Sequence, residues 1–147
     1  TKFVRLERVP TLIFRTFLDR LINLKSLTLT TSVLNSLNAA QFQYRTCLYT
    51  LTILQFDDQT NNFVHVEPFC TMFSRIEHVD LPIDTIESCQ YLIERLGSDL
   101  ISIIFRFSND ADEDDDEEEN EKIRWIESLR VKQQYRLCDG DLYLWLH

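Results

Sequence analysis

Apolar residues recur along this chain at a fixed spacing, and the sequence shows the same spacing four times. Each occurrence follows the pattern L-x-x-L-x-L with conservative replacements: Leu24, Leu27 and Leu29; Leu51, Leu54 and Phe56; Ile76, Val79 and Leu81; Leu100, Ile103 and Phe105. The first positions are 27, 25 and 24 residues apart, within the roughly 20 to 29 residues typical of leucine-rich repeats. The fourth and sixth positions point to the same face of a strand. The pattern therefore predicts four strands that share one core.

The segments between these strands change to helical periodicity. In residues 84–96, Asp84 can cap a helix, apolar residues line one face, and Gly97 can end it. The same reasoning predicts helices over residues 10–21, 32–44 and 121–134, and a shorter one over residues 66–74. Because each interval between strands is far too long for a hairpin, the strands should be parallel and joined by helical crossovers.

The chain ends in a fifth apolar strand, in which Leu142, Leu144 and Leu146 alternate with aromatic residues. It begins later than one repeat would allow, and the excess matches an acidic run, so that run is interpreted as an insertion. Tyr143 and Trp145 could then close the open core of a terminal repeat. The sequence thus predicts an α/β leucine-rich-repeat solenoid of about five irregular repeats. Its parallel strands would lie on the concave side and its helices on the convex side, in a single domain over residues 1–147.

The acidic run dominates the charge of the chain. Residues 110–121 carry ten acidic side chains, against a net charge of −9 for all 147 residues, so the rest is nearly neutral. We expect a solvated, disordered loop over residues 109–121, with electrostatic steering of a basic partner as the functional alternative. The run lacks the ligand order of a calcium-binding EF-hand. The charge distribution also argues against nucleic acid as a partner.

With its repeats and its aromatic last strand (YLWLH, residues 143–147), the chain resembles the leucine-rich-repeat regions of F-box-type substrate receptors. In that family an N-terminal F-box docks on a ubiquitin-ligase adaptor, and the repeats hold the substrate. No F-box segment is visible here, so the resemblance implies the substrate-holding half, with the adaptor reached only through an upstream region. Since the chain begins at Thr1 without an initiator Met, we expect it to be the C-terminal part of a longer protein.

The candidate binding site is the concave sheet face. It consists of strand positions that alternate with the core residues, and the candidates are Thr28, Thr30, Ile53, Gln55, Asp57, His78, Asp80, Ser102, Ile104 and Arg106. This mixture of apolar and polar side chains suits a protein interface, although an ordinary solvent-facing sheet would look the same. The sequence does not identify the protein partner.

Catalytic chemistry finds little support in the sequence. Two glycines in 147 residues argue against glycine-rich phosphate loops. The class-level alternative is a cysteine hydrolase in which Cys70 uses His65 or His78 as its base, but cysteine more often packs as a small hydrophobe. We therefore expect no enzyme, no cofactor and no metal; a structural scaffold without a ligand is a further alternative. Four cysteines without a CxxC pair, no glycosylation motif and no apolar membrane span favour a cytoplasmic or nuclear location.

Overall fold

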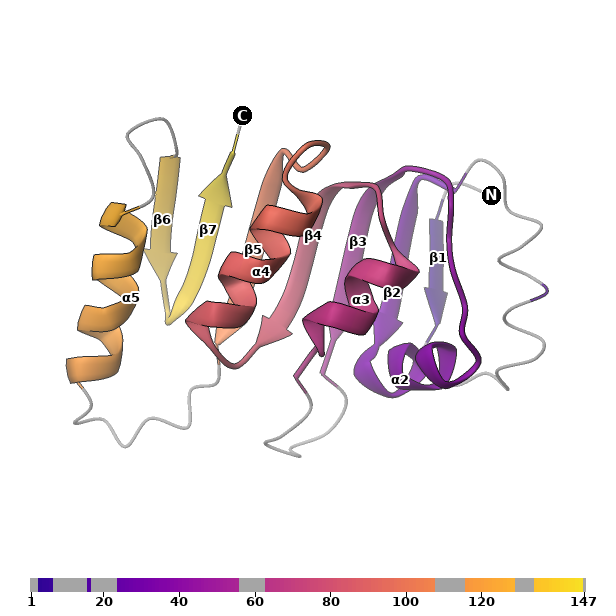
Figure 1. Cartoon of the computed structure of the whole chain (residues 1–147), viewed down its shortest axis with the longest axis horizontal. Coiled ribbons are helices and arrows are strands. Elements are labelled where there is room, and N and C mark those ends of the chain that lie inside the picture. Colours follow the sequence, from indigo (N-terminus) through magenta and orange to yellow (C-terminus); the bar gives the residue numbers. More distant parts are fainter. Residues whose placement is uncertain are drawn as a thin grey trace.

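The computed structural model of the chain describes residues 3–6, 16, 24–55, 63–107, 116–128 and 134–146. One sheet of seven strands runs through it in the order β1-β2-β3-β4-β5-β7-β6 (Figure 1). The strands are β1 (Phe3–Leu6), β2 (Ser26–Thr30), β3 (Leu48–Leu54), β4 (Ile76–Ile83), β5 (Ser102–Phe107), β6 (Gln134–Cys138) and β7 (Asp141–Trp145). The helices are α2 (Thr31–Ala39), α3 (Val66–Met72), α4 (Ile86–Leu96) and α5 (Asp116–Ser128).

The predicted parallel-strand solenoid is wrong, because the sheet is mixed. Strands β1 to β5 are parallel, but β7 pairs antiparallel with β5 and β6 pairs antiparallel with β7. The cause is a tight turn between β6 and β7, where Asp139 and Gly140 have φ angles of 53° and 82°. Two positive φ angles in a two-residue Asp-Gly loop are the conformation that closes a β-hairpin. The chain therefore ends in a hairpin on an α/β domain and not in a fifth repeat.

The register of β3 differs from the prediction by three residues. Leu51 pairs with Leu27 and Ile53 pairs with Leu29, so the apolar triplet of this strand is Leu48, Leu51 and Ile53. All three side chains are at most 1% exposed. The sequence allowed both alignments, because Leu48-x-x-Leu51-x-Ile53 has the same spacing as the triplet that begins at Leu51. Packing selects the alignment that places the three side chains beside those of β2.

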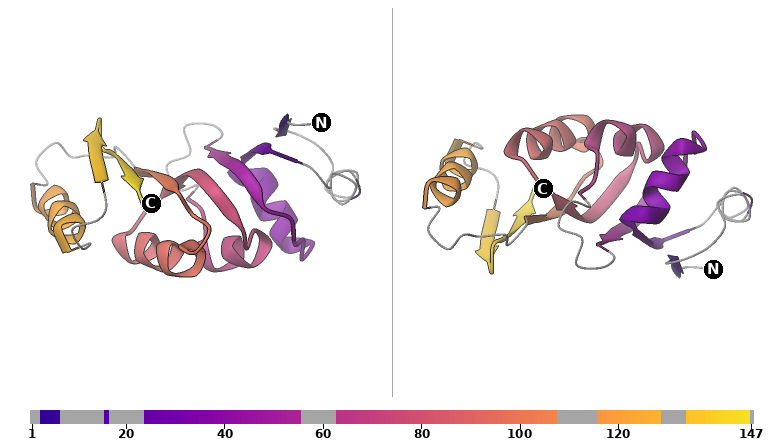
Figure 2. Two further views of the ribbon diagram at one scale, coloured as in Figure 1. Left: turned by 90° about the horizontal axis from the view of Figure 1, so that it is seen from above. Right: turned by 90° about the horizontal axis from the view of Figure 1, so that it is seen from below.

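Helices cover one face of the sheet, and the core lies between the two layers. Figure 2 shows α2, α3 and α4 on one side of the sheet. The strand residues that face these helices are nearly inaccessible, at most 3% exposed: Leu27, Leu29, Leu51, Ile53, Val79, Leu81, Ile103, Phe105, Leu142 and Leu144. Helix α5 joins the same layer, because the rings of Trp125 and Phe105 pack with centroids 6.3 Å apart. We call the opposite side, on which none of the described helices lies, the helix-free face.

Local signals set the helix boundaries. Thr30 accepts a hydrogen bond from the backbone N–H of Val33 and so caps α2, and Thr85 caps α4 in the same way through Ser88. Helix α5 begins at Asp116, so the part of the predicted acidic loop over residues 116–121 is helical. Acidic residues near a helix N-terminus interact favourably with its dipole, which explains this earlier start.

Other predictions fall partly outside the described residues. The acidic segment 109–115 lies outside them, as does the predicted helix 10–21 apart from Thr16. Within the described part of the chain, no helix is both long enough and apolar enough to cross a membrane.

Candidate binding face of the sheet

The register aligns the side chains of the helix-free face in rows that cross the strands. Residues that alternate with the core positions point to this face. One row contains Ser26, Thr50, His78, Ser102, Trp145 and Gln134, and the next contains Thr28, Thr52, Asp80, Ile104, Tyr143 and Arg136. A third, shorter row contains Pro82, Arg106, Asp141 and Cys138. The side chains of this face are therefore small and carry hydroxyl groups over β2 and β3. Over β4, β5, β7 and β6 they are mainly aromatic or charged.

Two accessible aromatic side chains lie in or beside the first row. Tyr49 at the start of β3 is 54% exposed and Trp145 at the end of β7 is 41% exposed. The Tyr49 ring meets the His78 ring edge to face, with centroids 4.8 Å apart. Accessible tyrosine and tryptophan are enriched where proteins bind one another.

His78 and Ser102 form a cross-strand hydrogen bond between β4 and β5. Nδ1 of His78 and Oγ of Ser102 lie 2.6 Å apart. Serine hydrolases use a serine–histidine pair in which the serine bonds Nε2 and an acid bonds Nδ1 of the histidine. Here it is Nδ1 of His78 that meets Ser102. Asp80, the acid two residues further along β4 on the same face, is paired with Arg106. The contact therefore differs from that of a catalytic triad.

Asp80 and Arg106 form an ion pair at the charged end of the face. Nη2 of Arg106 donates to Oδ2 of Asp80 at 2.6 Å, and the two side chains are 47% and 15% exposed. The other oxygen of Asp80, Oδ1, is buried and has no hydrogen-bond partner in the described part of the chain. Burial raises the pKa of Asp80 above its usual value, although the hydrogen bond and charge of Arg106 oppose the rise.

The structure brings together six of the ten predicted site residues: Thr28, His78, Asp80, Ser102, Ile104 and Arg106 lie on the helix-free face. Ile53 was predicted there but belongs to the core, because of the register of β3. Thr30 is 1% exposed, and its hydroxyl is engaged in capping α2. Gln55 is exposed beyond the end of β3, and Asp57 lies outside the described residues.

Sequence reasoning missed the contribution of the hairpin to this face. Asp141, Tyr143 and Trp145 lie beside Arg106, Ile104 and Ser102 of β5. Tyr143 and Trp145 were expected to close the core of a terminal repeat, but they belong to a hairpin strand beside β5. The Asp139-Gly140 dipeptide, followed by strict apolar alternation, was the signal that could have placed these residues on the face.

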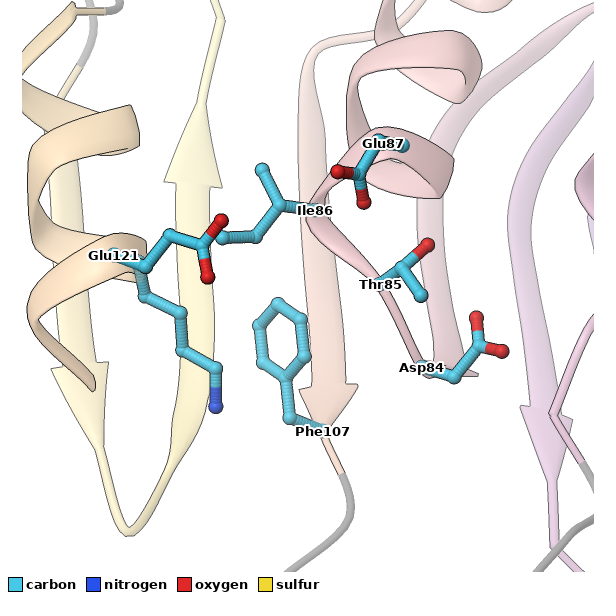
Figure 3. A pocket seen from close by; sticks show the side chains of 7 residues that line it. Asp84, Thr85, Ile86, Glu87, Phe107 and Glu121 are labelled. Carbon is cyan, nitrogen blue, oxygen red and sulfur yellow. The ribbon is translucent and has the colours of Figure 1, made fainter. Parts of the chain in front are cut away.

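A separate hollow lies between the N-terminus of α4, the end of β5 and α5. It encloses about 290 Å³ and is lined by Asp84, Thr85, Ile86, Glu87, Phe107, Glu121 and Lys122 (Figure 3). The Lys122 ammonium lies 4.3 Å from the centre of the Phe107 ring, a cation–π contact. Among the described residues, no group of three or more His, Cys, Asp or Glu side chains could hold a metal ion.

The buried cysteines are poor candidates for nucleophiles. Cys70 is a residue of α3 that faces the core and is 7% exposed; burial raises its pKa to about 11, although Arg95 opposes the rise. Burial also raises the pKa of Cys89. A nucleophilic cysteine needs its thiolate, which these surroundings disfavour. His78, one of the two bases considered for Cys70, has its ring against Tyr49 and Ser102 on the helix-free face.

Comparisons with family models, with curated proteins and with solved structures gave no match.

Proposed function

We propose that this domain is a non-catalytic protein-binding module whose interface is the helix-free face over β3, β4, β5 and β7. The observation that carries the proposal is a set of neighbouring side chains on this face. The Tyr49 ring contacts His78, Ile104 lies beside Tyr143, and Trp145 lies beside Ser102, next to the ion pair of Asp80 and Arg106. Interfaces characteristically combine accessible aromatic side chains with arginine and a polar rim.

The strands and core beneath this surface suit binding of a partner better than catalysis. Each strand that carries a surface residue also sends apolar side chains into the core, so the backbone of the face is held by the packing beneath it. A preorganised surface spends less conformational entropy on binding. The cysteine-hydrolase alternative is disfavoured because burial holds the Cys70 thiol in its protonated form.

Random short peptides displayed on phage and selected against the wild-type domain would supply ligands for the test. The affinity of the selected peptides is then measured by fluorescence anisotropy for wild type and for Trp145→Asp. Truncating an aromatic anchor at the centre of an interface commonly costs about 2 kcal/mol or more, so we expect a loss of roughly 30-fold. Urea denaturation would check that the variant is folded.

The matched control is Tyr135→Asp. Tyr135 is 47% exposed and lies on β6, beside β7. It pairs with the buried Leu144, so its ring belongs to the opposite side of the sheet from Trp145. We expect the peptides to bind this variant as they bind wild type. Peptides that bind all three proteins equally would move the interface away from the helix-free face and would refute the proposal.

The resemblance to the substrate-holding region of F-box-type receptors supplies a cellular role for such an interface. Within the same proposal, the bound partner is a substrate of a ubiquitin ligase, and the contact with the adaptor is made by a region other than this chain. The proposed location is the cytoplasm or the nucleus. The four cysteines support it, because all of them are unpaired thiols in the structure.

A further inference from the structure

Asp141 is an acidic residue on the helix-free face that has no ion-pair partner among the described residues. It stands opposite Arg106 in the register of β5 and β7, but the guanidinium of Arg106 donates to Asp80. Within the described part of the chain, the Asp141 carboxylate forms neither a hydrogen bond nor an ion pair. Its side chain is half-buried between β5 and β6, so its charge is less well solvated than that of an acid on an open loop.

The charged groups that act on the Asp141 carboxylate are mostly acidic. Asp80 and Asp141 both lie next to the guanidinium of Arg106, and Asp139 adds a third carboxylate from the turn. Arg136 lies on the same face, but it stands beside Tyr143 and not beside Asp141. Among the described residues Oδ1 of Asp80 has no donor, so Arg106 does not satisfy even Asp80 completely. Burial raises the pKa of Asp141, and the charges of Asp80 and Asp139 raise it further against the opposing effect of Arg106. A second cation would be stabilised at this position.

Two aromatic side chains extend from Asp141 along β7. Tyr143 and Trp145 follow at two-residue intervals and therefore lie on the same face as Asp141. Two residues of a strand span about 6.8 Å, which an arginine side chain can bridge. Its planar guanidinium can pair with a carboxylate while the rest of the side chain stacks on an aromatic ring.

Resting on the function proposed above, we propose that Asp141, Tyr143 and Trp145 form a subsite for one arginine residue of an extended partner segment. The guanidinium pairs with the Asp141 carboxylate, the aliphatic stem lies over Tyr143, and the partner's backbone continues toward Trp145. The acidic run over residues 110–121 contains no aromatic residue, so it offers an arginine charge complementarity without a ring to stack on. The subsite adds a defined orientation.

An NMR titration of the isotope-labelled protein with Nα-acetyl-arginine methylamide tests the subsite directly. We expect the signals of Asp141, Tyr143 and the Trp145 indole to shift in a saturable manner. The matching citrulline compound has nearly the same shape without the charge, and we expect it to leave those signals in place. Asp141→Asn should weaken binding of the arginine compound by about fivefold, as loss of one accessible ion pair does. Asp84→Asn, in the hollow beside α4, should leave binding unchanged.

Three outcomes would overturn the subsite. They are shifts confined to residues 110–121, equal shifts with the citrulline compound, and shifts that appear on raising the protein concentration alone, which would mean that a second copy of the chain covers the face. The result separates this inference from the proposed function. Suppose that selected peptides lose affinity for Trp145→Asp and yet keep their affinity for wild type when their basic residues are replaced by citrulline or norleucine. That result would support the interface and refute the arginine subsite.

Discussion

The two faces of the sheet are built from the same strands but differ in burial: one packs against the helices, and the other is accessible. Neighbouring residues of β5 show the difference: Ile103 is completely buried against the helices, whereas Ile104 is partly accessible on the helix-free face beside Tyr143. Along β4 the same alternation separates the buried Val79 and Leu81 from His78 and Asp80. One face therefore specifies the fold, and the other is free to carry chemistry that the fold does not need.

A matched pair of substitutions on β5 tests this division most strongly. Ile103→Ala removes a fully buried side chain and should lower the free energy of unfolding by roughly 2–5 kcal/mol in urea denaturation. Ile104→Ala removes the same atoms from the accessible face and should cost about 1 kcal/mol or less. Equal losses from the two substitutions would mean that the helix-free face is also packed, and the contrast between the faces would be lost.

The regular part of the chain was predictable because its packing is periodic. The strands β2 to β5 lie where the apolar triplets placed them, with a shift in β3 only, where two alignments of leucine and isoleucine satisfied one pattern. Sequence spacing alone could not choose between them, because the choice depends on which side chains of β2 stand opposite. That single ambiguity moved Ile53 from the core into the predicted site.

The C-terminal part was harder to predict because its direction depends on a turn and not on periodicity. The leucines of β7 have the same alternation in a parallel and in an antiparallel strand, so only the Asp139-Gly140 turn distinguishes the two. Extrapolating the repeat past β5 gave a solenoid where the chain forms a hairpin. The error concealed Asp141, Tyr143 and Trp145, which lie on the candidate face only because β7 returns beside β5.

Thr30 provides a second, smaller test, because it was expected on the binding face but caps α2. Thr30→Val keeps the shape of the side chain and removes the hydroxyl that accepts from Val33. We expect a loss of about 1 kcal/mol in the free energy of unfolding, with unchanged affinity for the selected peptides. Thr28→Val, two residues earlier on the same strand, is the control and should change stability by less than about 0.5 kcal/mol. A peptide affinity that falls with Thr30→Val in a folded protein would return this residue to the interface.

The smallest expected effect is the contribution of Asp80 to the pH dependence of the free energy of unfolding. Because burial raises the pKa of the folded carboxyl above the usual 3.8, the folded state holds this proton more tightly than the unfolded state. The stability that Asp80 contributes is therefore present below the unfolded pKa and is lost as the pH rises through the folded pKa. The difference in unfolding free energy between wild type and Asp80→Asn should accordingly decline as the pH rises above the usual pKa of 3.8.

Arg106 determines how steep that decline is, because its guanidinium lowers the pKa of Asp80 and so opposes the effect of burial on that pKa. In an Arg106→Gln background the pKa of Asp80 should rise further, so the same comparison with Asp80→Asn should decline more steeply and over a wider pH range. A difference that instead grew with pH in the wild-type background would mean that pairing with Arg106 outweighs burial. The carboxylate would then stabilise the fold, and the helix-free face would share in the stability that we assign to the helix-covered one.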